Sequence, residues 1–160
     1  MKICHVINSL SGGGAETHLL DLVNAQRNEG HELYVISTGP DKTNMASLEL
    51  QFKEIVNKVY RLNAPRLFNL ISYRALFNIQ KKMAFDIVHT HQPRSDTMFY
   101  AVKTFLRHKP KWIVSIHGKY DTYLEGKLSS NLLKKFLMPL LVFIWSKSNH
   151  IICISSEVGT

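Results

Sequence analysis

The sequence is poor in cysteine and has no long uninterrupted apolar segment. Cys4 and Cys153 are the only cysteines among 160 residues, which excludes a disulfide framework and a metal site made of four cysteines. The longest apolar run, residues 136–145, is interrupted by Pro139, whereas a membrane-spanning helix needs about 20 apolar residues. The first ten residues hold one lysine and a broken apolar run, unlike a secretory signal peptide. We therefore expect a cytoplasmic protein that does not cross a bilayer.

The composition is that of one globular domain with a basic second part. Apolar residues make up 45% of the chain and charged residues 20%, as in ordinary folded proteins, and 160 residues can bury one sizeable core. The net charge is +8 at pH 7. Residues 1–50 carry three basic and six acidic groups, and residues 51–160 carry 17 and six. The later part is expected to attract anions.

Short runs rich in β-branched residues alternate with stretches of helical period. We predict strands at residues 2–7, 32–37, 58–62, 86–91, 112–117 and 150–154, mostly continuous apolar runs as expected of parallel strands buried on both faces. Right-handed crossovers then favour a Rossmann-like doubly wound α/β sheet of strand order 3-2-1-4-5-6.

Five helices are expected between these strands. The first carries Ala15 to Gln26 and ends at a left-handed Gly30, and the second covers residues 48–56. The third, residues 67–83, is expected to bury Phe68, Ile71, Ala75, Leu76, Ile79 and Met83. Ser95 is expected to cap the fourth, which turns Met98, Val102, Phe105 and Leu106 inward. The fifth covers residues 129–146.

Three glycines follow the first predicted strand, at Gly12, Gly13 and Gly14. Glycine allows close approach of a ligand to the backbone, and the next helix offers free N–H groups to an anion. The alternative is a tight turn without a ligand. No Gly-Lys-Ser/Thr follows, which excludes a P-loop, and Thr17 stands where a dinucleotide fingerprint needs Gly or Ala. A nicotinamide-dependent oxidoreductase is therefore a disfavoured alternative.

Histidines end the fourth and fifth predicted strands. His89 and His91 lie on the same side of a strand, and with His117 they could bind a metal, but no carboxylate or cysteine is near in sequence. Hydrogen bonding to a polyhydroxylated ligand is favoured, with Arg94 either available for a phosphate or simply solvated. His117 can donate to an oxyanion or hold a sugar hydroxyl. The histidines assigned to packing or surface are His5, His31, His108 and His150.

A basic apolar helix near the C-terminal end has two interpretations. Lys127, Lys134 and Lys135 stand beside Leu132, Leu133, Phe136, Leu137 and Met138. Such a helix is expected in a core or domain interface, and the alternative is contact with an anionic membrane. A non-enzymatic module that binds membrane or nucleic acid is therefore a second alternative for the whole chain.

Four segments, KICHVINSLSGGGAETHLLDL, DIVHTHQ, WIVSIHG and NHIICISSEV, resemble in order and spacing the N-terminal domain of family 4 glycosyltransferases, which have the two-domain GT-B fold. The resemblance implies that residues 1–160 are the acceptor-side domain and that a C-terminal nucleotide-sugar-binding domain lies outside this chain, which alone is expected to be inactive. It implies a retaining, hexosyltransferase-type transfer from a nucleotide-sugar to a saccharide or lipid-linked acceptor, in cell-envelope polysaccharide synthesis.

The resemblance also assigns roles to individual residues. It implies no metal or other cofactor, no nucleic acid, and a cytoplasmic protein that can contact the inner face of a membrane peripherally. Gly12, Gly13, Gly14 and Glu16 match the segment that closes over the donor diphosphate. His117 matches the histidine that lies against the donor sugar and helps the transfer. The acceptor-side wall is expected to include His91, Arg94, Gly118 and Lys119.

Overall fold

The computed structural model describes residues 1–40, 46–118 and 131–154, the last range without the side chains of residues 131–136. Six parallel strands form one sheet of order β3-β2-β1-β4-β5-β6, which confirms the predicted fold class and strand order. The strands are β1 (Lys2–Ile7), β2 (Glu32–Ser37), β3 (Lys58–Arg61), β4 (Ile87–Thr90), β5 (Lys111–Ile116) and β6 (His150–Cys153). The helices are α1 (Gly14–Asn28), α2 (Glu49–Ile55), α3 (Leu70–Met83), α4 (Pro93–Lys103) and α6 (Asn131–Trp145).

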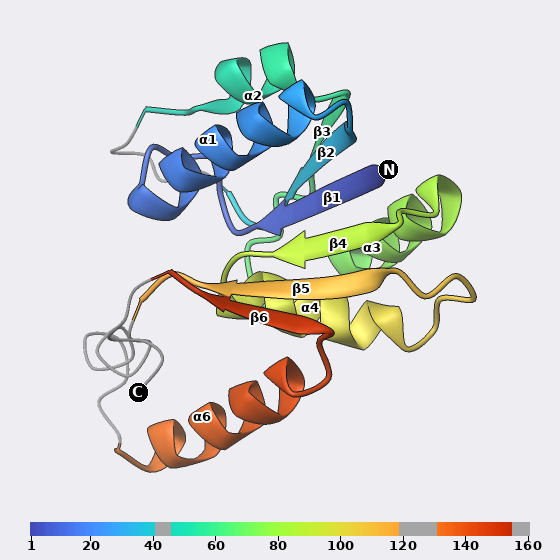
Figure 1. Ribbon diagram of the computed structural model, residues 1–160. Coiled ribbons are helices and arrows are strands. Elements are labelled where there is room, and N and C mark those ends of the chain that lie inside the picture. Colours follow the sequence, from blue (N-terminus) through green and yellow to red (C-terminus); the bar gives the residue numbers. More distant parts are fainter. Residues whose placement is uncertain (41–45, 119–130, 155–160) are drawn as a thin grey trace.

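The helices cover the sheet from both sides. Figure 1 shows α1 and α2 on one face, and α3, α4 and α6 on the other. The chain leaves β1 toward β2 on one side and later returns to place β4 on the other side of β1, so the carboxyl ends of β1 and β4 form the switch point where ligands of such sheets bind. Among the described residues, no helix is long and apolar enough to span a bilayer.

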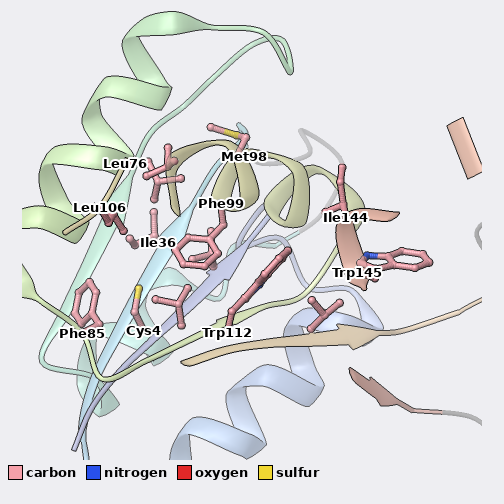
Figure 2. Close-up of a cluster of buried hydrophobic side chains, with 14 of the residues drawn as sticks. Cys4, Ile36, Leu76, Phe85, Met98, Phe99, Leu106, Trp112, Ile144 and Trp145 are labelled. Atoms are coloured by element: carbon pink, nitrogen blue, oxygen red, sulfur yellow. The ribbon is translucent and has the colours of Figure 1, made fainter. Parts of the chain in front are cut away.

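The larger core lies between the sheet and the helices α3, α4 and α6 (Figure 2). Trp112 is fully buried, and its ring makes an edge-on contact with Phe99 at 5.5 Å between centroids. The indole N–H of Trp112 donates to Thr90 Oγ1 at 3.0 Å, so its polar atom is satisfied inside the core, as buried tryptophan requires. These contacts fix α4 against β4 and β5.

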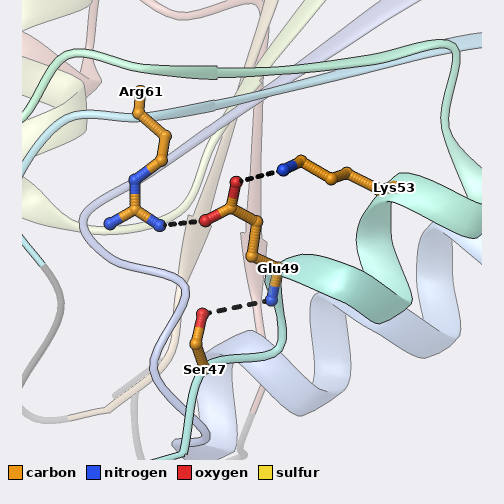
Figure 3. Close-up of polar contacts among 4 residues, drawn as sticks. All are labelled: Ser47, Glu49, Lys53 and Arg61. Carbon is orange, nitrogen blue, oxygen red and sulfur yellow. Dashed lines mark hydrogen bonds and ion pairs between the residues drawn. The ribbon is translucent and has the colours of Figure 1, made fainter.

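The smaller core lies under α1 and α2 and contains Leu19, Val23 and Phe52. At its rim, Glu49 at the start of α2 pairs with Lys53 at 2.7 Å and with Arg61 of β3 at 2.5 Å, and its backbone N–H donates to Ser47 Oγ at 3.2 Å (Figure 3). The first pair is a favourable i, i+4 spacing on a helix. Glu49 thereby ties the start of α2 to the edge strand β3.

The buried face of α3 differs from the prediction. The helix starts at Leu70, and Asn69 caps it by accepting from the N–H of Ser72 at 3.1 Å. Phe68 is therefore in the preceding loop and 85% exposed, and Ile71 is 81% exposed, so the predicted inward placement of both is wrong. The interior instead takes two polar residues of α3, Ser72 and Gln80, together with Leu76. The spacing of apolar residues along a sequence does not indicate which polar side chains are buried in the core.

The start and end of α4 also differ from the prediction. Pro93 is the first helical residue and Gln92 precedes it, because proline suits a position whose N–H has no partner in the helix. Ser95 lies inside the first turn and is buried, so it is not the cap. The helix ends at Lys103, and Phe105 beyond it is 77% exposed rather than inward. Met98 and Val102 are buried as predicted.

The edge strand β6 is the most exposed strand of the sheet. All four of its residues are exposed, Ile151 and Ile152 by 48% and 44%, which corrects the expectation of a strand buried on both faces. β6 pairs only with β5 among the described strands, so it is an edge. The predicted strand order already placed this strand at the edge, but the continuous apolar sequence indicated burial on both faces, which an edge position does not provide. Gly30 has φ +79°, which confirms the predicted left-handed end of α1.

Candidate functional site

The residues selected from the sequence converge on the carboxyl edge of β1, β4 and β5. The glycine loop, residues 9–14, leaves β1 and enters α1, His91 directly follows β4, and His117 directly follows β5. The ring of His117 makes an edge-on contact with that of His18 at 5.5 Å between centroids. His18 lies one helical turn after Gly14, so the glycine loop and the edge histidine border one site.

The glycine loop is fixed by the segment that precedes α2. The N–H of Gly12 donates to the carbonyl of Ala46 at 2.8 Å, and the N–H of Leu48 donates to the carbonyl of Leu10 at 2.7 Å. Two donors of the loop are therefore used inside the fold, since the N–H of Gly13 also donates, to the carbonyl of Ser11 at 2.7 Å. The N–H groups of the first turn of α1, which begins at Gly14, are those that a helix leaves without an intrahelical partner. They are the donors that remain suited to an anion.

Only one of the three glycines is tightly enclosed. A Cβ at Gly13 would lie 2.6 Å from Glu16 Oε2, whereas a Cβ at Gly14 would meet no atom within 4 Å and one at Gly12 only ordinary contacts. Glu16 itself is buried and accepts from Ser9 Oγ at 3.2 Å. The carboxylate thus packs behind the loop, where the negative charge suits the start of a helix, and a side chain at residue 13 would have to displace it.

Asn8, which the sequence interpretation did not select, joins three strand ends. Its N–H donates to Gln92 Oε1 at 3.0 Å, and its carbonyl accepts from the N–H of Gly39 at 2.6 Å. The hydroxyl of Thr38 donates to its Oδ1 at 3.4 Å. A polar residue immediately after a buried strand at the switch point is the signal that identifies such a position. Asn8 holds the ends of β1, β2 and β4 in register beneath the site.

A row of histidines runs from α1 to the edge. His5 Nε2 lies 2.7 Å from Gln26 Oε1, and His5 Nδ1 lies 3.0 Å from His91 Nε2. His91 Nδ1 in turn lies 3.2 Å from Nε2 of His117. His5 is buried, in agreement with its assignment to packing, but no feature of the sequence indicates that it reaches His91. We call Gln26, His5, His91 and His117 the histidine row.

Burial keeps these imidazoles neutral. It lowers the pKa of His5 to about 4, partly opposed by the hydrogen bond that His5 donates to Gln26 Oε1, and lowers the pKa of His117 to about 4. Burial also lowers the pKa of His89 to about 2, and the pKa of His91 lies well below its usual value for the same reason. Neighbouring histidines add to the effect in His89, His91 and His117, because two cations in contact repel each other.

Two histidines of the row, together with His89, have the spacing of a possible metal site. One ring nitrogen from each of His5, His89 and His91 lies within 4.8 Å of the others. The ring nitrogens of His5 and His91 all have the partners given above, and His89 Nε2 lies 2.7 Å from Ser115 Oγ. A metal would have to replace these hydrogen bonds, and these three residues supply no anionic ligand, although neutral imidazole alone is a common ligand. The arrangement fits a hydrogen-bonded network better than a metal centre.

Arg94 is anchored through one guanidinium nitrogen, Nη2, whereas its buried Nε has no hydrogen-bond partner among the described residues. Its guanidinium donates to the carbonyl of Ala64 and, at 3.1 Å, to the carbonyl of Arg66, and the side chain is half-buried. The alternative of a merely solvated arginine is wrong. Arg94 fastens the loop after β3 to the start of α4, directly beside Gly39. Its place on an acceptor-side wall stays a prediction.

Gly118 is partly exposed, and a Cβ there would meet no atom within 4 Å. Lys119 and Lys127 lie outside the described residues, and so do the side chains of Lys134 and Lys135. The interpretations that depend on them stay predictions. Both cysteines are free thiols, Cys4 buried and Cys153 exposed.

Comparison with solved structures places this fold among GT-B glycosyltransferases. The chain superposes on the apo form of the lipopolysaccharide outer core galactosyltransferase WaaB with a TM-score of 0.65 and 16% identity, over 99% of this chain and 40% of that one. Sucrose-phosphate synthase from Thermosynechococcus elongatus gives 0.69 and 12%, over 99% and 44%. Anabaena HepE in complex with UDP and glucose gives 0.64 and 15%, over 94% and 37%. The chain thus spans about two fifths of the length of these proteins.

Sequence comparison identifies the family. No curated protein sequence matches the chain significantly. The family model for Glycosyltransferase Family 4, in contrast, matches residues 12–160, which include the three glycines of the loop, His91, His117 and every strand after β1. With this match and the Rossmann-like sheet described above, we conclude that the chain belongs to glycosyltransferase family 4.

Proposed function

We propose that this chain is the N-terminal, acceptor-side domain of a retaining glycosyltransferase of the hexosyltransferase type, which transfers a sugar from a nucleotide-sugar to a saccharide or lipid-linked acceptor in cell-envelope polysaccharide synthesis. The observation that carries the proposal is the contact of His117 with His18, one turn from Gly14. The contact places the imidazole of His117, which can form a hydrogen bond with a sugar hydroxyl, beside the first turn of α1, whose N–H groups can bind a diphosphate.

The relatives support the donor class. HepE was solved with UDP and glucose, and an α-glucosyltransferase that superposes with a TM-score of 0.56 at 14% identity was solved with UDP and DNA. Both are GT-B proteins whose length exceeds twice that of this chain. We infer that a second, nucleotide-sugar-binding domain completes the active site and that residues 1–160 alone do not turn over. No metal or other cofactor is assigned a step in this proposal.

The test is sugar transfer by the complete protein. We expect His117→Ala to reduce the transfer rate from a panel of UDP- and GDP-sugars, since no other described residue places an imidazole at the end of β5. His31→Ala, a histidine substitution in the turn after α1, is the matched control and should leave the rate unchanged. Equal rates for both variants would contradict the role of His117. Binding of NAD in preference to nucleotide-sugars would contradict the proposed reaction.

We also propose peripheral contact with an anionic membrane, through the surface of α3 and α4 rather than through the basic apolar helix for which membrane contact was the alternative interpretation. Leu70 and Phe105 are exposed by 85% and 77% and line one groove with Arg74, and Phe68 and Ile71 beside Leu70 are similarly exposed. Residues 62–83 contain no acidic side chain. Apolar side chains among cations are typical of surfaces that bind anionic lipid, which would place the protein at the inner face of the membrane.

Vesicle sedimentation tests this contact. We expect the chain to bind vesicles that contain phosphatidylglycerol more strongly than pure phosphatidylcholine vesicles, and Leu70→Ser with Ile71→Ser to weaken the binding. Leu50→Ser is the matched control, because Leu50 is 73% exposed but lies on α2, on the opposite face of the sheet. An equal loss in the control, or no binding by the wild type, would overturn the proposal.

A further inference from the structure

The histidine row links the edge of the site to a polar side chain far from it. Gln26 lies near the end of α1, His5 in the middle strand β1, His91 after β4 and His117 after β5. The three successive separations are 2.7, 3.0 and 3.2 Å. His5 and His91 are completely buried, so no water competes for these ring nitrogens, and each bond in the row depends on the next.

A neutral imidazole has one N–H and one unprotonated nitrogen. In a row of such rings, two facing nitrogens must be one donor and one acceptor, because two N–H groups in contact would repel and two lone pairs would leave both buried atoms unsatisfied. All bonds in the row therefore point the same way. The group at the end of the row selects the direction. The lowered pKa values of His5 and His91 agree with neutral rings.

Gln26 presents its carbonyl oxygen Oε1 to His5, and a carbonyl oxygen only accepts. His5 Nε2 must then carry the proton, and His5 Nδ1 accepts from the Nε2–H of His91. His91 Nδ1 in turn accepts from the Nε2–H of His117. At the end of the row, Nδ1 of His117 keeps its lone pair.

We propose that Gln26, through His5 and His91, is a positioning residue that holds His117 in the Nε2–H tautomer, so that His117 Nδ1 accepts a hydrogen bond from a hydroxyl group of the bound sugar rather than donating to an oxyanion. The tautomer follows from the orientation of the Gln26 amide, which faces His5 with Oε1 and not with its NH2 group, and its use for a sugar rests on the proposed function. The sequence left open whether His117 donates or accepts, and the row decides between these two roles.

Nitrogen-15 NMR of the histidine side chains tests the tautomer in the absence of any substrate. In the wild-type chain, the His117 signals, assigned by their loss in His117→Asn, should show a protonated Nε2 and an unprotonated Nδ1. Gln26→Glu keeps an acceptor at the end of the row and should give the same pattern. Gln26→Met removes the acceptor and should give a mixture of both tautomers. Ser115→Ala alters the partner of His89 outside the row and should leave His117 unchanged.

A wild-type His117 with its proton on Nδ1, or a single unchanged tautomer in Gln26→Met with native far-ultraviolet circular dichroism, would overturn the proposal. In the complete protein, Gln26→Met should reduce the transfer rate and Gln26→Glu should restore it. The outcomes for the two proposals are separable. If His117→Ala leaves the transfer rate unchanged while the NMR pattern is as expected, the proposed function is wrong and the inferred tautomer is correct. If His117→Ala strongly reduces the rate while His117 has its proton on Nδ1, the inferred tautomer is wrong and the proposed function is supported.

Discussion

His91 Nδ1 lies 3.2 Å from Nε2 of His117, and His91 is fully buried. His117 at the strand edge is therefore positioned by His91, which lies deeper in the fold. Because His91 is buried, water does not compete for its hydrogen bonds. This single contact connects the site to the interior of the sheet. Because a buried imidazole is costly to charge, it also connects the site to the acid stability of the domain.

We expect the free energy of unfolding to decrease as the pH falls from about 6.5 to about 4. His5, with a folded pKa of about 4, stays neutral in the folded chain while the unfolded chain takes up a proton at its ordinary value of 6.5. Stability is thus fully present above pH 6.5 and is lost on acidification, by up to about 1.4 kcal/mol per pH unit for each such group. His89 and His91 act in the same direction.

Urea unfolding at pH 7.5, 6 and 5 measures this loss. It is best carried out in the variant Asp96→Asn, because the buried Asp96 of the wild-type chain changes the stability in the opposite direction over the same pH range. Replacing His89 with Gln should make the decrease less steep, because one buried imidazole is removed. A denaturation midpoint independent of pH between 7.5 and 5 would show that the histidines become protonated inside the fold at little cost.

Asp96 should have the opposite effect. Burial raises its pKa from 3.8 to about 7, although the indole N–H of Trp145, which donates to Oδ2 at 2.8 Å, favours the ionised form. The folded chain therefore retains a proton that the unfolded chain releases. The contribution of Asp96 to the free energy of unfolding is consequently present below about pH 4 and is lost as the pH rises to about 7. Asp96→Asn should become more stable relative to wild type across that range. A constant difference between the two chains would disprove the raised pKa.

The glycine loop can be tested by a pair of alanine substitutions. Gly13→Ala should destabilise the chain by about 1–3 kcal/mol, because the new Cβ would overlap the buried Glu16 carboxylate. Gly14→Ala meets open space and should leave the stability unchanged or raise it by a few tenths of a kcal/mol. Thermal unfolding checks both.

The same pair separates a turn from a ligand loop. In the complete protein, Gly14→Ala should weaken nucleotide-sugar binding although the fold is intact, since its methyl group would occupy the space of the diphosphate. Normal binding by Gly14→Ala, measured by calorimetry, would identify the glycines as a structural turn only.

Arg94→Lys should destabilise the chain by about 1–2 kcal/mol, because both hydrogen bonds to the carbonyls of Ala64 and Arg66 come from Nη2 of the guanidinium, which lies one atom farther along the side chain than a lysine ammonium. Hydrogen exchange at residues 62–66 should increase with it. Arg74→Lys, on the exposed face of α3, is the control, with an expected change below about 0.5 kcal/mol. If the two variants are equally stable, the guanidinium of Arg94 is dispensable for the loop and is free for a ligand.

The sequence by itself determined the class of the fold, the strand order and the edge at which the site lies. Runs such as residues 2–7 and 32–37 are apolar throughout, and parallel strands with short crossovers leave few topologies. The residues after β1, β4 and β5 could be chosen in advance, because the carboxyl ends of parallel strands meet at one edge. The glycine loop and His117 were found in this way.

Only the tertiary structure decided which polar residues belong to that site and how they are connected. Gln26 and His5 are 21 positions apart and carry no sequence signal of contact, because a hydrogen bond across a helix and a strand depends on how the two elements pack. The same packing turned Ser72 and Gln80 inward and left Ile71 outside. Periodicity reports the average polarity of a face, whereas a buried polar group is decided by the individual partner that it meets.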